Sequence, residues 1–110
     1  MARSDRSVLP GSTAMLVLAL LKAREMYGYE IIEELEKRSN QVFQLKEGTL
    51  YPILHSLEKE KLVTARDQEA PSGRKRRYYH ITAAGLQALD AKKEEWQTFS
   101  QAVTAILAGA

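Results

Sequence analysis

The run Ala14–Leu21 is the longest stretch of the sequence without a polar side chain. It is far shorter than the roughly 20 apolar residues that a helix needs to cross a bilayer. A helix that is apolar on every side is buried all round, so other segments must cover this one. The preceding Pro10–Thr13 is typical of a helix start, with Ser12 or Thr13 as the N-cap. We expect residues 1–9, which mix charged and small side chains, to form a flexible arm.

Two arginines, Arg3 and Arg6, precede the apolar run, as they also would in a secretory signal peptide. However, Lys22, Arg24 and Glu25 follow the run directly, at the place where a cleavage site requires small residues. We therefore expect neither a signal peptide nor a membrane span, and a cytoplasmic protein.

A second apolar pattern at helical spacing follows an interruption at Tyr27–Tyr29. Its apolar positions are Ile31, Ile32 and Leu35. Charged side chains, mostly glutamates, occupy the other face, and Ser39–Asn40 ends the pattern. The sequence therefore predicts an amphipathic second helix.

A third helix is predicted from a buried stripe made of Leu50, Ile53, Leu54 and Leu57. Because proline lacks an N–H and belongs in the first turn, Pro52 predicts a start near Gly48 or Thr49. The face opposite the stripe is polar and carries no acidic side chain before Glu58. Its residues are Thr49, Tyr51, Pro52, His55, Ser56 and Lys59.

After Lys61 the apolar period changes from helical to two, which predicts a strand from Leu62 to about Glu69. Pro71–Gly73 is a turn, and Lys75–Ile81 is a second strand, so the two strands form a β-hairpin. The whole chain has a net charge of only +2, but segment 72–80 alone carries +4.

Side chains of the second strand alternate between two faces. With Ile81 toward the core, Tyr79 and Arg77 share its face, whereas Arg74, Arg76 and Tyr78 lie on the other. The four cations of this segment therefore cannot all contact one row of phosphates. We expect Arg74 and Lys75 at the hairpin tip to make the phosphate contacts, and the two tyrosines to pack within the hairpin and core.

A last helix is predicted from Thr82, its N-cap, to about Leu107. Such a helix of about 26 residues is about 39 Å long. The preceding domain of about 75 residues is only about 25–30 Å across. The helix should project beyond that domain and leave its apolar end in water, so we infer a second chain.

Three helices followed by a hairpin make a winged helix-turn-helix, in a fold that is mainly α with a small β-hairpin. We expect this unit to span residues 10–81 and a long C-terminal dimerisation helix to occupy residues 82–110. The third helix of such a fold can enter a major groove while the hairpin contacts phosphates. Double-stranded DNA is therefore the expected partner. A winged helix that binds protein or RNA without an operator is the alternative.

An enzyme is not indicated. The sequence lacks cysteine, and His55 and His80 are too far apart for a metal-ligand motif. It contains no nucleophile–base pair and no glycine-rich phosphate loop followed by lysine. We expect no metal and no cofactor.

Several motifs, in this order along the chain, resemble the PadR family of transcriptional regulators. They are Tyr27–Ile31, Gly48–Pro52, Leu57–Val63 and Gly73–Gly85, and the resemblance covers roughly residues 12–86. Lys61 departs from the pattern, because the family has a helix-ending glycine there. The resemblance, to the short subfamily with one C-terminal helix, implies a homodimer formed by that helix. It also implies repression of transcription.

The candidate DNA-binding residues are Tyr29, Thr49, Tyr51, His55, Ser56, Lys59, Ser72, Gly73, Arg74, Lys75 and Arg76. Tyr51, an outward aromatic that a helix start does not need, is the preferred groove or phosphate contact. His55 is equally consistent with a base contact and with a merely exposed side chain.

The last helix places the large side chain of Trp96 beside the polar Lys93 and Ser100, an unusual mixture for a helix pair packed by leucines. This predicts a slot between two chains for a small planar, apolar or aromatic effector. The resemblance implies effectors of the same kind. The residues expected in this pocket or in the dimer interface are Met15, Leu89, Lys93, Trp96, Phe99, Ser100 and Val103. The alternative is that Trp96 is ordinary interface core.

Overall fold

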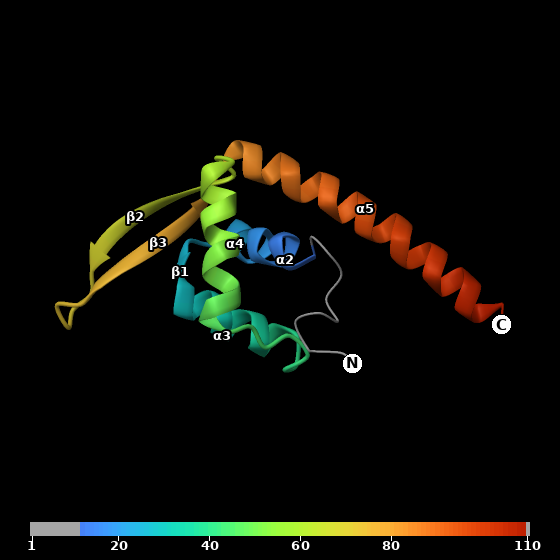
Figure 1. Cartoon of the computed structure of the whole chain (residues 1–110), viewed down its shortest axis with the longest axis horizontal. Helices are drawn as coiled ribbons and strands as arrows, with labels where there is room; N and C mark the ends of the chain where they lie inside the picture. The colour runs from blue at the N-terminus through green and yellow to red at the C-terminus, as the bar shows by residue number, and fades with distance from the viewer. Residues whose placement is uncertain (1–11, 110) are drawn as a thin grey trace.

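The computed structural model of the chain describes residues 12–109. The predicted arm 1–9, the predicted helix-start residues Pro10 and Gly11, and Ala110 lie outside the described residues. The elements in chain order are α2 (Ser12–Ala23), β1 (Met26–Tyr27), α3 (Gly28–Arg38), α4 (Glu47–Lys59), β2 (Val63–Glu69), β3 (Lys75–Ile81) and α5 (Ala83–Ala108). This order confirms the predicted mainly helical fold, with a hairpin and a long last helix (Figure 1).

Helix α2 lies at the centre of the fold, as its apolar run Ala14–Leu21 requires. It contacts α3, α4, α5 and β3. Val17, Leu18, Leu20 and Leu21 are buried, whereas Met15 is only partly buried against the same core. Much of the apolar run is thus covered by other elements of the same chain.

Strand β1 was not predicted, because two residues are too few to show a period. Met26 pairs with Tyr79 and Tyr27 pairs with Tyr78, which extends the hairpin to a three-stranded antiparallel sheet in the order β1-β3-β2. Tyr27 is also the N-cap of α3, where its backbone N–H donates a hydrogen bond to the Glu30 carboxylate at 3.2 Å. The apparent interruption at Tyr27–Tyr29 is therefore a direct passage from strand to helix.

Helix α4 begins at Glu47, slightly before the predicted start, so Pro52 lies in the second turn. Proline gives the carbonyl of Gly48 no N–H partner. Both Gly48 and Pro52 are exposed, so water can take the place of the missing hydrogen bond. Leu50, Leu54 and Leu57 of the predicted stripe are buried, and Ile53 is partly buried against the core.

Helix α5 begins as predicted, with the Thr82 hydroxyl accepting the N–H of Gly85 at 3.0 Å. It runs for 26 residues to Ala108, one residue past the predicted end. The molecule measures 57 × 30 × 20 Å. The hairpin and α5 project to opposite sides of the helices (Figure 1), which confirms that the last helix extends beyond the preceding domain.

Candidate nucleic-acid interface

The face of α4 that points away from the core carries most of the predicted groove residues. Pro52, His55, Ser56 and Lys59 are exposed, because the buried leucines fix the opposite face. Thr49 and Tyr51 are only partly buried. Tyr51 departs from its expected outward position, since its side chain packs against the start of α3 at Gly28.

The tip of the hairpin forms a tight turn after Glu69, which pairs with Lys75. The N–H of Gly73 donates to the carbonyl of Ala70 at 2.8 Å, and the φ of Gly73 is +87°, a conformation that favours glycine. The predicted contact residues Ser72, Gly73, Arg74 and Lys75 are all exposed at this tip.

The cations of β3 alternate between faces as predicted. Tyr79 and Ile81 are buried, and the Arg77 guanidinium lies 6.0 Å from the Tyr79 ring centre on the same face. Arg76 lies on the opposite face, 4.4 Å from the ring centre of Tyr27.

Arg77 is held by two carboxylates and is therefore not free to neutralise phosphates. Its guanidinium lies 2.8 Å from Glu58 of α4 and 3.5 Å from Asp67 of β2. Among the described residues, Arg74 and Lys75 form no ion pair. The tip of the hairpin thus presents the unpaired positive charge, while Arg77 ties the hairpin to α4.

The other face of the sheet carries an aromatic and ionic cluster that sequence reasoning missed. The rings of Tyr27 and Tyr78 meet edge to face with centres 5.4 Å apart, and Arg66 lies 5.5 Å from the Tyr78 ring. Arg66 also forms a salt bridge with Glu25. The hydrogen bond from Arg66 lowers the pKa of Glu25, so this carboxylate stays ionised to lower pH. Strand alternation predicts the outward position of Arg66, but nothing local points to Glu25.

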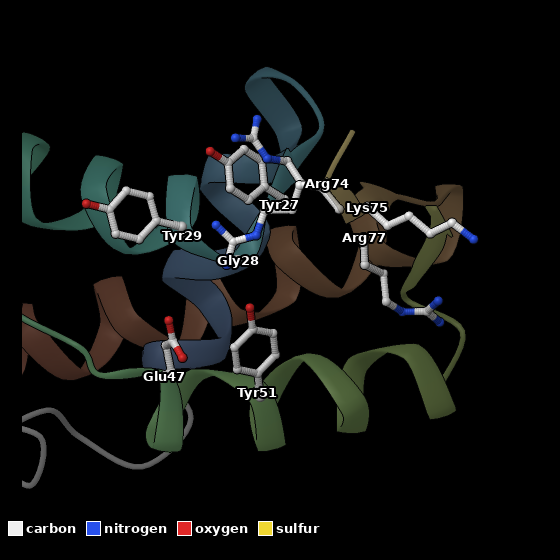
Figure 2. Close-up of a pocket in the computed structure, with 9 residues that line it drawn as sticks. Tyr27, Gly28, Tyr29, Glu47, Tyr51, Arg74, Lys75 and Arg77 are labelled. Atoms are coloured by element: carbon white, nitrogen blue, oxygen red, sulfur yellow. The ribbon is translucent and has the colours of Figure 1, made fainter. Parts of the chain in front are cut away.

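A hollow of about 530 Å³ lies between the N-terminal ends of α3 and α4 and strand β3 (Figure 2). It brings together five of the predicted contact residues: Tyr29, Tyr51, Arg74, Lys75 and Arg76. The remaining four lining residues, Tyr27, Gly28, Glu47 and Arg77, were not predicted. Thr49, His55, Ser56, Lys59, Ser72 and Gly73 do not line it.

Tyr29 is half exposed at the edge of this hollow. Its phenol is protonated at neutral pH, as tyrosine ordinarily is, and the negative charge of nearby Glu33 raises its pKa further. Glu47 adds a carboxylate to the lining, which otherwise consists of tyrosines, cations and Gly28. The arrangement offers hydroxyl and cationic donors to an anionic ligand.

The residues predicted for an effector pocket or dimer interface are separated in the single chain. Leu89 is buried in the core of this chain and Met15 is partly buried there. Trp96 and Phe99 stack with ring centres 6.0 Å apart, yet are 41% and 49% exposed. Lys93 and Val103 are exposed and Ser100 is partly buried.

Within residues 12–109, no group of three or more His, Cys, Asp or Glu side chains is placed to hold a metal ion. Over the same residues, no helix combines the length and apolar character that crossing a membrane requires.

Comparison with known proteins relates this arrangement to a family of regulators. The model of the "Transcriptional regulator PadR-like family" matches residues 17–91. A PadR-like transcriptional regulator from Bacillus cereus strain ATCC 14579 is similar in structure, with a TM-score of 0.78 and 35% identity, over 92% of this chain and 96% of that one. A transcriptional regulator from Clostridium thermocellum has a TM-score of 0.82 and 30% identity, over 89% of this chain and 95% of that one.

One curated relative is longer than this chain. The transcriptional regulator YqjI of Escherichia coli (strain K12) is 27% identical over 98% of this chain, which spans only 50% of that protein.

Proposed function

Because the chain belongs to the PadR-like family of transcriptional regulators, we propose that it binds a specific DNA operator as a homodimer and represses transcription. In this proposal α4 enters the major groove, and the tip of the hairpin contacts the phosphates beside it.

One observation carries the proposal: the hairpin tip presents cations without an ion-pair partner among the described residues, and the Glu58 carboxylate of α4 is paired with Arg77. Arg74 and Lys75 are exposed at the hairpin tip. The exposed face of α4 has His55, Ser56 and Lys59. Glu58 would oppose DNA, but its carboxylate is occupied by Arg77. A surface of this kind suits a polyanion with readable base edges.

The proposed homodimer rests on the apolar side chains that α5 leaves in water. Trp96, Phe99 and Val103 are exposed, and Ile106 and Leu107 are more than two-thirds exposed. A second copy that packs its own α5, together with α2, against this face would bury them. A truncation after Ala88 should therefore yield a monomer or an insoluble chain. A truncated protein that still sediments as a stable dimer would contradict this interface.

A two-fold dimer presents two copies of α4 and so implies a pseudo-palindromic duplex. The half-sites should lie about one helical turn, roughly 34 Å, apart. DNA footprinting tests this geometry directly, because two protected half-sites on one face of the duplex are expected.

We further propose that a small planar, apolar or aromatic effector binds between the chains near Trp96 and Phe99. The stacked and exposed rings support this, because a planar molecule can extend such a stack. To relieve DNA binding tenfold, the effector must favour the DNA-free dimer by about 1.4 kcal/mol. Titration of planar compounds while the fluorescence of Trp96 is followed tests the pocket. If no compound changes it and Trp96→Ala only monomerises the protein, Trp96 is interface core.

The rival function is a winged helix that binds protein or RNA. Operator binding is favoured if the protein enriches one duplex from a random-sequence library and if its affinity for that duplex falls steeply with salt concentration. In that case Arg74→Ala should weaken binding to the enriched duplex and to random DNA alike. A protein that enriches no duplex would favour the rival.

A further inference from the structure

We propose that Tyr51 is a positioning residue. Its ring packs directly on the backbone of Gly28, and this contact, called the seat of Tyr51, fixes the recognition helix α4 relative to the start of α3. This inference rests on the proposed function, because what the seat positions is the DNA-reading face of α4. Tyr51 then sets where neighbouring side chains meet the bases, rather than reading a base itself.

The contact between Gly28 and Tyr51 leaves no room for a side chain at position 28 unless the Tyr51 ring moves. A Cβ atom on Gly28 would lie 2.8 Å from Cζ and 3.2 Å from Cε1 of Tyr51, and closer still to the hydroxyl oxygen. Ordinary carbon–carbon contact lies at about 3.5–4.0 Å. Figure 2 shows the ring rising from α4 toward Gly28 with its hydroxyl end foremost.

The backbone conformation does not explain this glycine. Of the glycines in the described residues, Gly73 alone has a positive φ, whereas Gly28 starts a helix with ordinary geometry. Gly48, near the start of α4, has no atom within 4 Å of the position of an added Cβ. The absence of a side chain at Gly28 is therefore a packing requirement, and Tyr51 imposes it.

The seat holds α4 close to the residues that are proposed to contact the bases. Tyr51 lies one helical turn before His55 on the same side of the helix, and the buried Leu50 and Leu54 lie about 100° and 60° around the helix from Tyr51. Contacts of Tyr51 with α3 and of the leucines with the core therefore hold α4 at different angles around its axis and oppose its rotation. Binding geometry must be held within roughly 0.5 Å and 10–20°. Base-edge hydrogen bonds depend on that precision, whereas phosphate contacts carry no sequence information.

The test is a double-mutant cycle in the full chain, with two probes: a duplex enriched by the wild type and a random duplex. Gly28→Ala should displace the Tyr51 ring and weaken binding to the enriched duplex about tenfold, a change of about 1.4 kcal/mol. Binding to the random duplex should change less than about twofold, equivalent to about 0.4 kcal/mol. In the Tyr51→Ala background the same Gly28→Ala change should have almost no effect, since the ring is gone.

The Tyr51→Phe background should give an intermediate result for Gly28→Ala. Tyr51→Phe removes the hydroxyl, which is the atom closest to the added methyl, but keeps the ring carbon at 2.8 Å. Gly28→Ala should therefore weaken binding less in this background than in the wild type and more than in the Tyr51→Ala background. Tyr51→Phe alone should retain sequence preference, because the ring still fills its seat.

Gly48→Ala is the matched control for folding, because it adds the same methyl group to the first turn of a helix where space is open. It should leave the melting temperature unchanged or raise it slightly. Binding is compared well below each variant's melting temperature, so that loss of folded protein does not imitate loss of specificity.

The outcomes separate the two proposals. If Gly28→Ala weakens binding to the enriched duplex by the same factor with and without the Tyr51 side chain, the proposed seat is refuted. Equal losses on enriched and random DNA overturn the positioning role and make Tyr51 a phosphate or purely structural residue. Failure of the wild type to enrich any duplex overturns the proposed function. The seat itself is then still tested by the same cycle measured in unfolding free energy, where additive effects would refute it.

Discussion

Lys61 ends α4 in a conformation that lysine adopts at a cost. Its φ is +65°, in the left-handed region. Its N–H donates to the carbonyl of Glu58 at 2.9 Å, and the N–H of Leu62 donates to the carbonyl of Leu57 at 2.9 Å. These two bonds are those of the helix end at which glycine is preferred. The PadR resemblance predicts glycine here, but in this chain lysine adopts the helix-ending conformation.

Lys61→Gly should therefore stabilise the protein. A non-glycine residue in the left-handed region costs roughly 1–2 kcal/mol because its Cβ crowds the carbonyl oxygen. Glycine in turn loses more conformational freedom on folding, which costs roughly 0.5–1 kcal/mol. The net gain should be about 0.5–1 kcal/mol, which raises the melting temperature of a domain of this size by about 2–8 °C. The Lys61 side chain is exposed, so little packing is lost.

The assay is thermal unfolding followed by circular dichroism, at one protein concentration because a dimer melts in a concentration-dependent way. Lys59→Gly is the control. Lys59 is the last residue of α4, so glycine there should destabilise by up to about 1 kcal/mol. Helix α3 ends with the same hydrogen-bond pattern around Asn40, whose φ is +56°. Lys61→Asn should therefore give part of the gain. A Lys61→Gly protein no more stable than the wild type refutes the argument.

Three further predictions concern stability. Gly85→Ala should destabilise by about 1–3 kcal/mol in denaturant unfolding, because an added Cβ would meet the carbonyl group of Leu62, with the carbon at 3.1 Å. Thr82→Ala removes the α5 N-cap, which accepts the Gly85 N–H, and should cost about 0.5–2 kcal/mol; Thr82→Ser should restore most of it. Because Arg66 lowers the pKa of Glu25, the stabilising effect of that carboxylate is present above its unfolded pKa of about 4.3. It is lost as pH falls through the lower folded pKa. The difference in unfolding free energy between the wild type and Glu25→Gln should therefore shrink as the pH is lowered.

The fold followed from the sequence wherever a period was long enough to read. The leucine stripe of α4, the alternation of β3 and the Thr82 cap were each predicted correctly from local patterns. Strand β1 was missed, because Met26–Tyr27 is too short to carry a period and forms only by pairing with β3. The start of α4 was placed late, because water can compensate for the exposed proline in the second turn.

The site was less predictable, because its side chains find partners that are distant in sequence. Alternation placed Arg77 on the core side, but only the packing of the hairpin on α4 brings it to Glu58. The pairing of Arg66 with Glu25 spans 41 residues. Tyr51 was expected to point outward from helical spacing, since nothing in α4 itself indicates that Gly28 provides a seat.

Because of these internal partners, fewer cations of segment 72–80 are available to DNA phosphates than its formal charge indicates. The sequence places +4 in segment 72–80, but Arg77 is paired with two carboxylates and Arg76 lies over Tyr27. In the proposed dimer, Arg74→Ala should remove two phosphate contacts and reduce the salt slope of DNA binding by about two units. Arg77→Ala removes the same formal charge, but it should leave the slope nearly unchanged and instead weaken binding to the enriched duplex by loosening the hairpin from α4. The measurement is the binding constant for each variant over a series of salt concentrations. Equal slopes for the two variants would mean that net charge, rather than the pairing of individual side chains, governs DNA binding.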